Sequence, residues 1–161
     1  CGEWDSLTEQ KRQIRPLSKR PAAQIQSLVH ASTTQLSRLA TGIGELDRVL
    51  GGGIVPGSMV LIGGDPGIGK STLILQLLSA LAGDERKVLY VTGEESTQQI
   101  RMRADRLAIE KEQIYLATEN CVESILTMSE KIRPALLAVD SIQTMFTEEA
   151  GSAPGSVTQV R

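Results

Sequence analysis

Residues 64–71 read Gly-Asp-Pro-Gly-Ile-Gly-Lys-Ser and lie between two apolar segments, residues 58–62 and 71–82. An apolar run, a glycine-rich turn and a second apolar stretch are typical of a strand, a loop and a helix. The three glycines let the backbone curl so that several N–H groups converge without Cβ clashes. The spacing G-x-x-x-x-G-K-[ST] is that of a phosphate-binding loop. A glycine-rich turn could match this pattern by chance, but the strand and helix contexts favour phosphate binding.

The charged and hydroxyl side chains of this loop have predicted roles in binding ATP and Mg²⁺. Lys70 would place a positive charge beside the β- and γ-phosphates, and the Ser71 hydroxyl would bind the metal ion. The positive end of the helix that begins near Lys70 is directed at the same anion. Lys70 is therefore also a candidate catalytic residue. The expected ATP-binding residues are Gly64, Asp65, Pro66, Gly67, Ile68, Gly69, Lys70, Ser71 and Thr72.

An aspartate, Asp140, directly follows the apolar run 135–139. The carboxyl end of a parallel strand faces the same crevice as a phosphate-binding loop. Asp140 is therefore a candidate catalytic residue that holds Mg²⁺ through water. The alternative is that Asp140 only caps the following turn. Gln143, three residues further on, is a candidate sensor of the γ-phosphate or else an ordinary polar loop residue.

Two adjacent acids, Glu94 and Glu95, follow the apolar run 88–92. An acid at this place can orient and deprotonate the water that attacks the γ-phosphate. Glu94 is preferred as the catalytic base because it lies nearer the end of the strand. The alternative is a pair of surface acids ahead of a helix N-terminus, where the helix dipole favours negative charge.

The rest of the chain alternates between strand and helix patterns, which predicts an α/β fold with a parallel β-sheet flanked by helices. Buried strands are expected at 58–62 and 88–92, and further strands at 114–117 and 135–139. Helices are expected at 43–50, 71–82, 97–108 and 123–132. Thr97 is expected to cap the third helix. Residues 1–37 are rich in polar and basic residues and are interpreted as a linker, which leaves residues 38–161 as the folded domain.

Composition limits the other functions that this segment could have. The net charge is −2 and aromatic residues make up 2% of the chain, so neither bulk charge nor a stacking platform indicates nucleic-acid binding. No apolar run approaches the length of a membrane span, and the N-terminus lacks the pattern of a signal peptide, which favours the cytoplasm. Cys121 is expected to be a small buried apolar residue. The chain begins without Met, and both ends resemble cuts in a longer protein.

Three blocks of the sequence, residues 39–53, 90–96 and 139–144, are similar to motifs of the bacterial RadA (Sms) family of DNA-repair proteins. The similarity covers about residues 39–161. It implies a RecA-like P-loop ATPase core that assembles as a homo-hexamer on DNA. It also implies DNA-dependent ATP hydrolysis and a role, with RecA as a partner, in processing branched intermediates of recombinational repair.

The same resemblance implies that the chain is truncated at both ends. Cys1, followed by Gly2-Glu3-Trp4, resembles the end of the family's four-cysteine zinc finger, but the other three ligands are absent. We therefore expect no bound Zn²⁺ here, and zinc only in the full-length family. The strand that would separate 59–62 from 135–139 would fall after residue 161. We therefore expect either that the segment is poorly stable alone, or that its sheet is left open or re-paired at its centre.

Two other interpretations remain open at the level of sequence. The chain could belong to a different RecA-like ATPase, such as a replicative helicase or a KaiC-like protein. It could also be a nucleotide-binding or oligomerisation module without catalytic activity.

Overall fold

The computed structural model describes residue 27, residue 29 and residues 37–148. Cys1 lies outside these residues, and so does the predicted linker apart from residues 27, 29 and 37. The chain divides into two units, residues 1–35 and 36–161, and every element described below belongs to the second unit.

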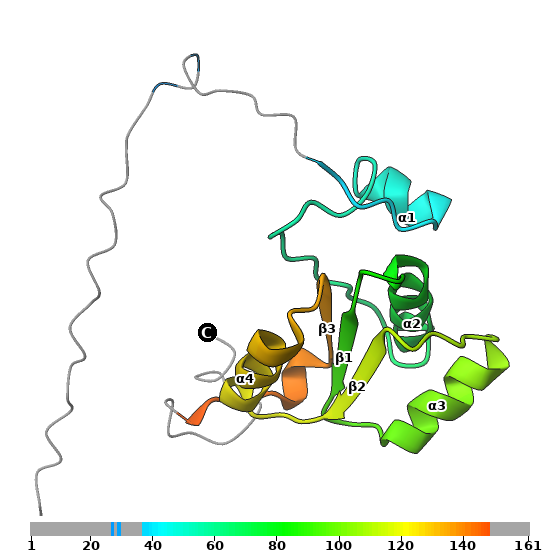
Figure 1. The fold of residues 1–161 in the computed structure, drawn as a ribbon, viewed down its shortest axis with the longest axis vertical. Helices are drawn as coiled ribbons and strands as arrows, with labels where there is room; N and C mark the ends of the chain where they lie inside the picture. The colour runs from blue at the N-terminus through cyan, green and yellow to red at the C-terminus, as the bar shows by residue number, and fades with distance from the viewer. Residues whose placement is uncertain (1–26, 28, 30–36, 149–161) are drawn as a thin grey trace, which may run out of the picture. The chain divides into compact units, whose positions relative to one another are not determined.

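The described part of the chain contains a parallel sheet of three strands. The strands are β1 (Val88–Thr92), β2 (Ile114–Thr118) and β3 (Leu136–Asp140), in the order β2-β1-β3. At the carboxyl ends Thr92 is in register with both Thr118 and Asp140, so all three strands end at the same edge (Figure 1). The predicted α/β fold with a parallel sheet is therefore confirmed.

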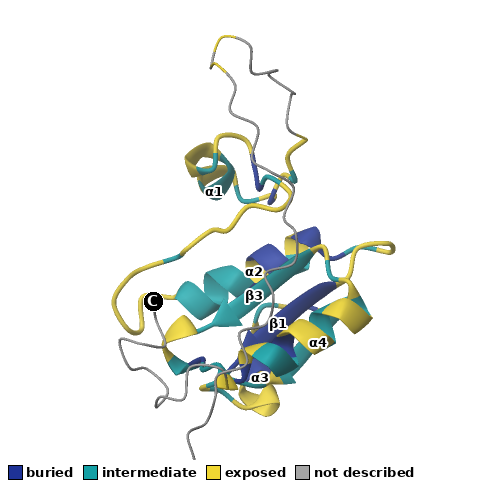
Figure 2. Ribbon diagram, turned by 90° about the vertical axis from the view of Figure 1, so that its left-hand side faces the viewer, coloured by how far each residue is buried: buried dark blue, intermediate teal, exposed yellow. Residues whose placement is uncertain are grey.

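Helices cover both faces of this sheet. The helices are α1 (Gly44–Val49), α2 (Lys70–Leu81), α3 (Thr97–Arg106) and α4 (Val122–Ile132), and a 3₁₀ helix, η2, spans Ile142–Thr144. Because strand side chains alternate between faces, Val88 and Tyr90 join the core beneath α2 and α3. Leu89 and Val91 join a second core beneath α4. The central strand β1 is buried along its whole length (Figure 2).

The predicted cap of α3 is displaced by one residue. Ser96, not Thr97, is the N-cap, because the Ser96 hydroxyl accepts the Gln99 N–H and the Gln99 side chain accepts the Ser96 N–H. This reciprocal pair satisfies two N–H groups that a helix start leaves without partners. Thr97 is instead the first helical residue.

The strand predicted at residues 58–62 does not form, although its apolar residues match the pattern of a buried strand. Met59 and Leu61 are 95% and 82% exposed. A strand exists only when a neighbour takes up its backbone hydrogen bonds, and the described residues provide no partner strand for this segment. The edge of β3 that faces away from β1 is likewise unpaired in the described part of the chain, so the sheet is open on that side, as expected.

The segment before the phosphate-binding loop folds around α1. The Asp47 carboxylate accepts the Thr41 N–H at 2.8 Å, and Leu39 forms an isolated antiparallel bridge with Ile54. Gly53 is required at this bridge because a Cβ there would collide with the Leu39 carbonyl group. Ile54 then joins the core that contains Leu78 of α2, which fixes the segment against α2.

Candidate nucleotide-binding site

The predicted phosphate-binding loop has an open, exposed backbone. Gly67 and Gly69 have φ angles of +79° and +103°, the left-handed region that favours glycine. The N-cap residue of α2 is Gly69, which has no side chain that could cap the helix. The first turn of α2 also contains no acidic residue. The N–H groups at the start of α2 are therefore available to an anion.

The Lys70 ammonium group lies over this loop. Its Nζ donates hydrogen bonds to the carbonyl oxygens of Gly64 and Asp65, both at 2.8 Å. A triphosphate can replace these carbonyl groups as a stronger, charged acceptor. Residues 63–69 are all exposed and Lys70 is half-buried, so the loop is open to a ligand from solvent (Figure 2).

Asp140 lies at the carboxyl edge of the sheet, as the last residue of β3 rather than the first residue after it. The loop after β1 reaches the same point, because the Gly93 N–H donates to the Asp140 carbonyl oxygen at 3.3 Å. The chain enters α2 at this end of the sheet and leaves it at the opposite end, where β1 begins (Figure 1). The carboxyl edge of the sheet is therefore the common location of the phosphate-binding loop, Asp140 and the residues after β1.

Sequence reasoning missed the hydrogen-bond partner of Asp140. The Tyr90 hydroxyl donates to Asp140 Oδ2 at 2.7 Å across the β1–β3 pair. Burial, followed by this bond to a carboxylate, raises the pKa of Tyr90 well above its ordinary value, so the phenol stays protonated as a donor. The available signal was a single tyrosine in a strand that otherwise holds three aliphatic residues and a threonine.

The structure separates the two candidate acids after β1. Glu95 forms a bidentate ion pair with Arg103 of α3, with N–O distances of 2.8 and 2.6 Å. This pairing raises the pKa of Arg103. Glu94 is exposed, and its Oε1 accepts a hydrogen bond from the Ser141 hydroxyl at 2.6 Å. Glu94 is thus held beside the residue that follows Asp140, whereas Glu95 is held by Arg103.

The loop that carries Glu94 packs closely against η2. A Cβ at Gly93 would collide with the Thr144 side chain, so only glycine fits between β1 and η2 in this arrangement. Gln143, the candidate γ-phosphate sensor, is an exposed residue of the same η2 helix. Gly93 was not singled out from the sequence, because its role depends on a contact with a residue about fifty positions away.

The predicted Mg²⁺ ligands fit that metal in their chemistry. Ser71 and Asp140 offer a hydroxyl and a carboxylate oxygen, the hard donors that Mg²⁺ prefers. Among the described residues, no group of three or more His, Cys, Asp or Glu side chains could hold a metal ion.

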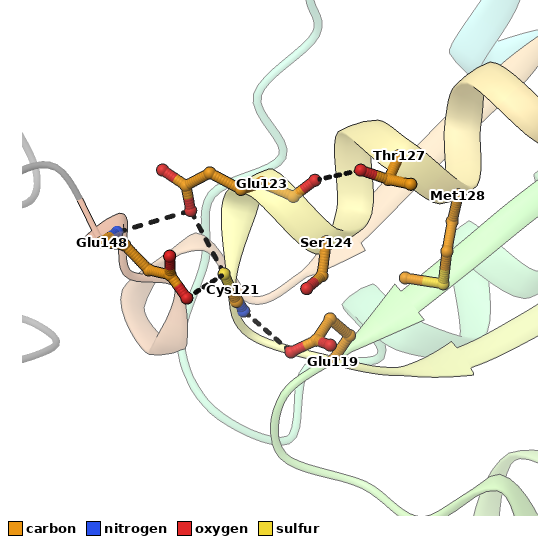
Figure 3. A pocket seen from close by; sticks show the side chains of 7 residues that line it. All are labelled: Glu119, Cys121, Glu123, Ser124, Thr127, Met128 and Glu148. Atoms are coloured by element: carbon orange, nitrogen blue, oxygen red, sulfur yellow. Dashed lines mark hydrogen bonds between the residues drawn. The ribbon is translucent and has the colours of Figure 1, made fainter.

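A pocket of about 430 Å³ lies elsewhere, between the end of β2 and the start of α4 (Figure 3). Its lining includes Glu119, Glu123 and Glu148, and contains none of the predicted site residues. The Thr147 hydroxyl and, more weakly, the Cys121 thiol donate to Glu123, which lowers the pKa of this carboxyl group to about 2. Such an acidic lining repels a triphosphate. Cys121 itself is buried, as predicted.

No helix in the part of the chain that the structure describes is long and apolar enough to cross a membrane.

Comparisons with known proteins agree with this geometry. The family described as "ATPase: KaiC" matches residues 39–132, more than half of the chain. The DNA repair protein RadA of Pseudomonas aeruginosa is 47% identical over 167 residues, that of Escherichia coli 45% over 172 and that of Mycobacterium tuberculosis 48% over 173. All three matches cover 100% of this chain, which spans only 35–37% of the length of these relatives.

The matched region extends from the segment around α1 through the phosphate-binding loop, Glu94 and α4. The resemblance to RadA that the three sequence blocks indicated is confirmed. The chain belongs to the ATPase family whose model is described as "ATPase: KaiC", and the three relatives named above are RadA proteins rather than helicases or clock proteins.

Proposed function

We propose that this chain is the nucleotide-binding part of an ATP-dependent DNA-repair protein that hydrolyses ATP to process branched DNA intermediates. One observation carries the proposal. The phosphate-binding loop at the start of α2, Asp140 at the end of β3 and Glu94 after β1 lie on one side of the same parallel sheet. Ligands of open α/β sheets bind at this carboxyl edge. The DNA-repair role is taken from the relatives, which bear that name.

The proposed roles follow the chemistry of each side chain. Residues 64–72 bind ATP, and Lys70 exchanges its two carbonyl acceptors for phosphate oxygens. Ser71 and Asp140 bind Mg²⁺, which, when present, neutralises charge on the β- and γ-phosphates. Gln143 is proposed as the γ-phosphate sensor because its helix follows Asp140 directly.

Glu94 is the proposed base for the attacking water. The ion pair of Glu95 with Arg103 is mostly buried, with side-chain exposures of 28% and 17%, so Glu95 is not free to accept a proton from water. Glu94 is exposed and near Asp140, and its hydrogen bond with the Ser141 hydroxyl leaves its second oxygen free to hold a water molecule.

The proposed partners come from the family resemblance. They are DNA, further copies of the same chain in a hexamer, and RecA, all in the cytoplasm. Zn²⁺ would belong to the zinc finger of longer members, of which Cys1 is at most the last ligand. The net charge of −2 implies that DNA contacts depend on residues of the longer protein or on a multimer that concentrates positive charge.

The test is ATP turnover by the full-length protein with and without single-stranded or branched DNA. We expect DNA to stimulate turnover, and we expect Asp140→Asn to abolish the stimulated rate. Turnover that DNA does not change would remove the DNA-dependent part of the proposal. Turnover that Asp140→Asn does not change would remove Asp140 from the site.

A further inference from the structure

The Tyr90 side chain is fully buried in the central strand, with 0% of its surface exposed. The other four residues of β1 are three aliphatic residues and a threonine. A phenylalanine would fill the same space, and burying a hydroxyl group is unfavourable unless it finds a partner. Packing alone therefore does not explain why a tyrosine stands here, whereas the hydrogen bond that its hydroxyl group makes does.

The acceptor of that bond is a specific one. Tyr90 OH donates to Asp140 Oδ2 at 2.7 Å, and not to a backbone carbonyl group of the sheet. The two residues lie on neighbouring strands, with Tyr90 paired to Ala138 and therefore two positions before Asp140 along the register. The phenol therefore reaches along the sheet towards the carboxyl edge. Helix α2, which follows the phosphate-binding loop, begins near the same edge (Figure 1).

We propose that Tyr90 is a positioning residue for the Asp140 carboxylate: it fixes Oδ2 and so keeps Oδ1 available to the hydration shell of Mg²⁺. This inference rests on the proposed role of Asp140 in binding Mg²⁺. A carboxylate held at one oxygen loses less rotational freedom when the other oxygen engages a ligand. Outer groups that orient metal-binding side chains commonly change metal affinity by 10–100-fold.

The test compares two matched variants of the full-length protein, Tyr90→Phe and Tyr115→Phe. Both remove one phenolic hydroxyl, but Tyr115 is 37% exposed and lies on β2, which β1 separates from β3 and Asp140. The affinity for a fluorescent ATP analogue is measured in Mg²⁺ and in EDTA, and the Mg²⁺ dependence of turnover is recorded alongside. The ratio of the affinity in Mg²⁺ to the affinity in EDTA gives the contribution of the metal ion, separately from nucleotide binding without metal.

We expect Tyr90→Phe to reduce the Mg²⁺-dependent gain in ATP affinity, and to raise the Mg²⁺ concentration for half-maximal turnover, by about tenfold. Its affinity in EDTA should stay within about twofold of wild type, and Tyr115→Phe should match wild type in every measurement. In an Asp140→Asn background, Tyr90→Phe should cause little further loss, because the two residues act through one interaction.

Two results would overturn the inference. An unchanged Mg²⁺ dependence in Tyr90→Phe would show that the hydroxyl does not position Asp140. An equal loss of affinity in Mg²⁺ and EDTA would show that Tyr90 only supports the fold. Asp140→Asn separates this failure from failure of the proposed function: if Asp140→Asn keeps the wild-type Mg²⁺ dependence, the metal role of Asp140 is itself wrong.

Discussion

Replacing Glu95 by Gln should destabilise the fold and leave ATP turnover nearly unchanged. Replacing Glu94 by Gln should leave the stability nearly unchanged and strongly reduce ATP turnover. The two acids are adjacent in sequence but differ in their contacts. Glu95 forms two charged hydrogen bonds with Arg103 in a partly buried setting, and Glu94 is exposed beside Ser141. Each variant keeps the size of the side chain, removes its charge and replaces one acceptor oxygen by an NH₂ group.

The size of the stability effect follows from the burial of the pair. Exposed ion pairs contribute about 0–1 kcal/mol, and breaking a fully buried pair costs about 3–5 kcal/mol. The Arg103 and Glu95 side chains are 17% and 28% exposed, which places this pair between the two cases. We therefore expect Glu95→Gln to lower the free energy of unfolding by about 2 kcal/mol. Glu94→Gln should change it by less than about 0.5 kcal/mol, as exposed substitutions usually do.

ATP turnover, in contrast to stability, should depend on Glu94 and hardly on Glu95. Removing a general base commonly costs 10²–10⁴-fold in rate, so kcat of Glu94→Gln should fall at least about 100-fold at saturating ATP and Mg²⁺. Turnover of Glu95→Gln should stay within about threefold of wild type. The assays are urea unfolding followed by circular dichroism and steady-state release of phosphate.

Arg103→Met supplies the control for the ion pair. It should cost at least as much stability as Glu95→Gln, because it leaves a carboxylate without its partner. In the double variant the two losses should be less than additive. A large loss of turnover in Glu95→Gln together with normal turnover in Glu94→Gln would refute the assignment of the two acids.

Three further predictions concern contacts that hold the fold together. Gly93→Ala should destabilise the fold by about 1–3 kcal/mol and lower turnover, since the added Cβ collides with the Thr144 side chain; thermal unfolding and phosphate release test it, with Gly83→Ala, which has open space at its Cβ, as the control. Ser96→Ala should cost about 0.5–2 kcal/mol through loss of the α3 capping box, and Ser58→Ala, outside any helix, should cost less in the same urea titration. The pKa of Glu123 is lowered from 4.5 to about 2 in the folded chain, so its contribution to stability is complete above about pH 4.5 and is lost as the pH falls towards 2. Unfolding free energies measured across this range should fall more steeply in wild type than in Glu123→Gln, and equal slopes would contradict the assigned shift.

Most elements could be predicted from the sequence because their patterns are local. Strand β1 was predicted with its observed bounds, and β2, α2 and α4 were predicted to within one residue at either end. The phosphate-binding loop was recognisable for the same reason, since its glycines, lysine and serine occupy consecutive positions. Composition and short-range spacing were sufficient wherever one segment determines its own conformation.

The failures occurred where a partner from elsewhere in the chain decides the outcome. Residues 58–62 match a strand, but the described residues offer no neighbouring strand to pair with them. The bond between Tyr90 and Asp140 joins residues 50 positions apart, and the ion pair of Glu95 with Arg103 depends on how α3 packs. Neither contact has a signature in local spacing. The different partners of Glu94 and Glu95 therefore become visible only in the folded structure.

The most direct test of the central claim is the affinity of ATP for the full-length protein with Lys70→Ala, measured at equilibrium. Lys70 Nζ is the charged donor that would exchange its contacts with Gly64 and Asp65 for phosphate oxygens. Because a charged hydrogen bond contributes about 1.5–3 kcal/mol, ATP affinity should fall at least about tenfold. Lys111→Ala, which removes an exposed lysine between α3 and β2, should bind like wild type. An unchanged affinity in Lys70→Ala would show that residues 64–72 are not the ATP site.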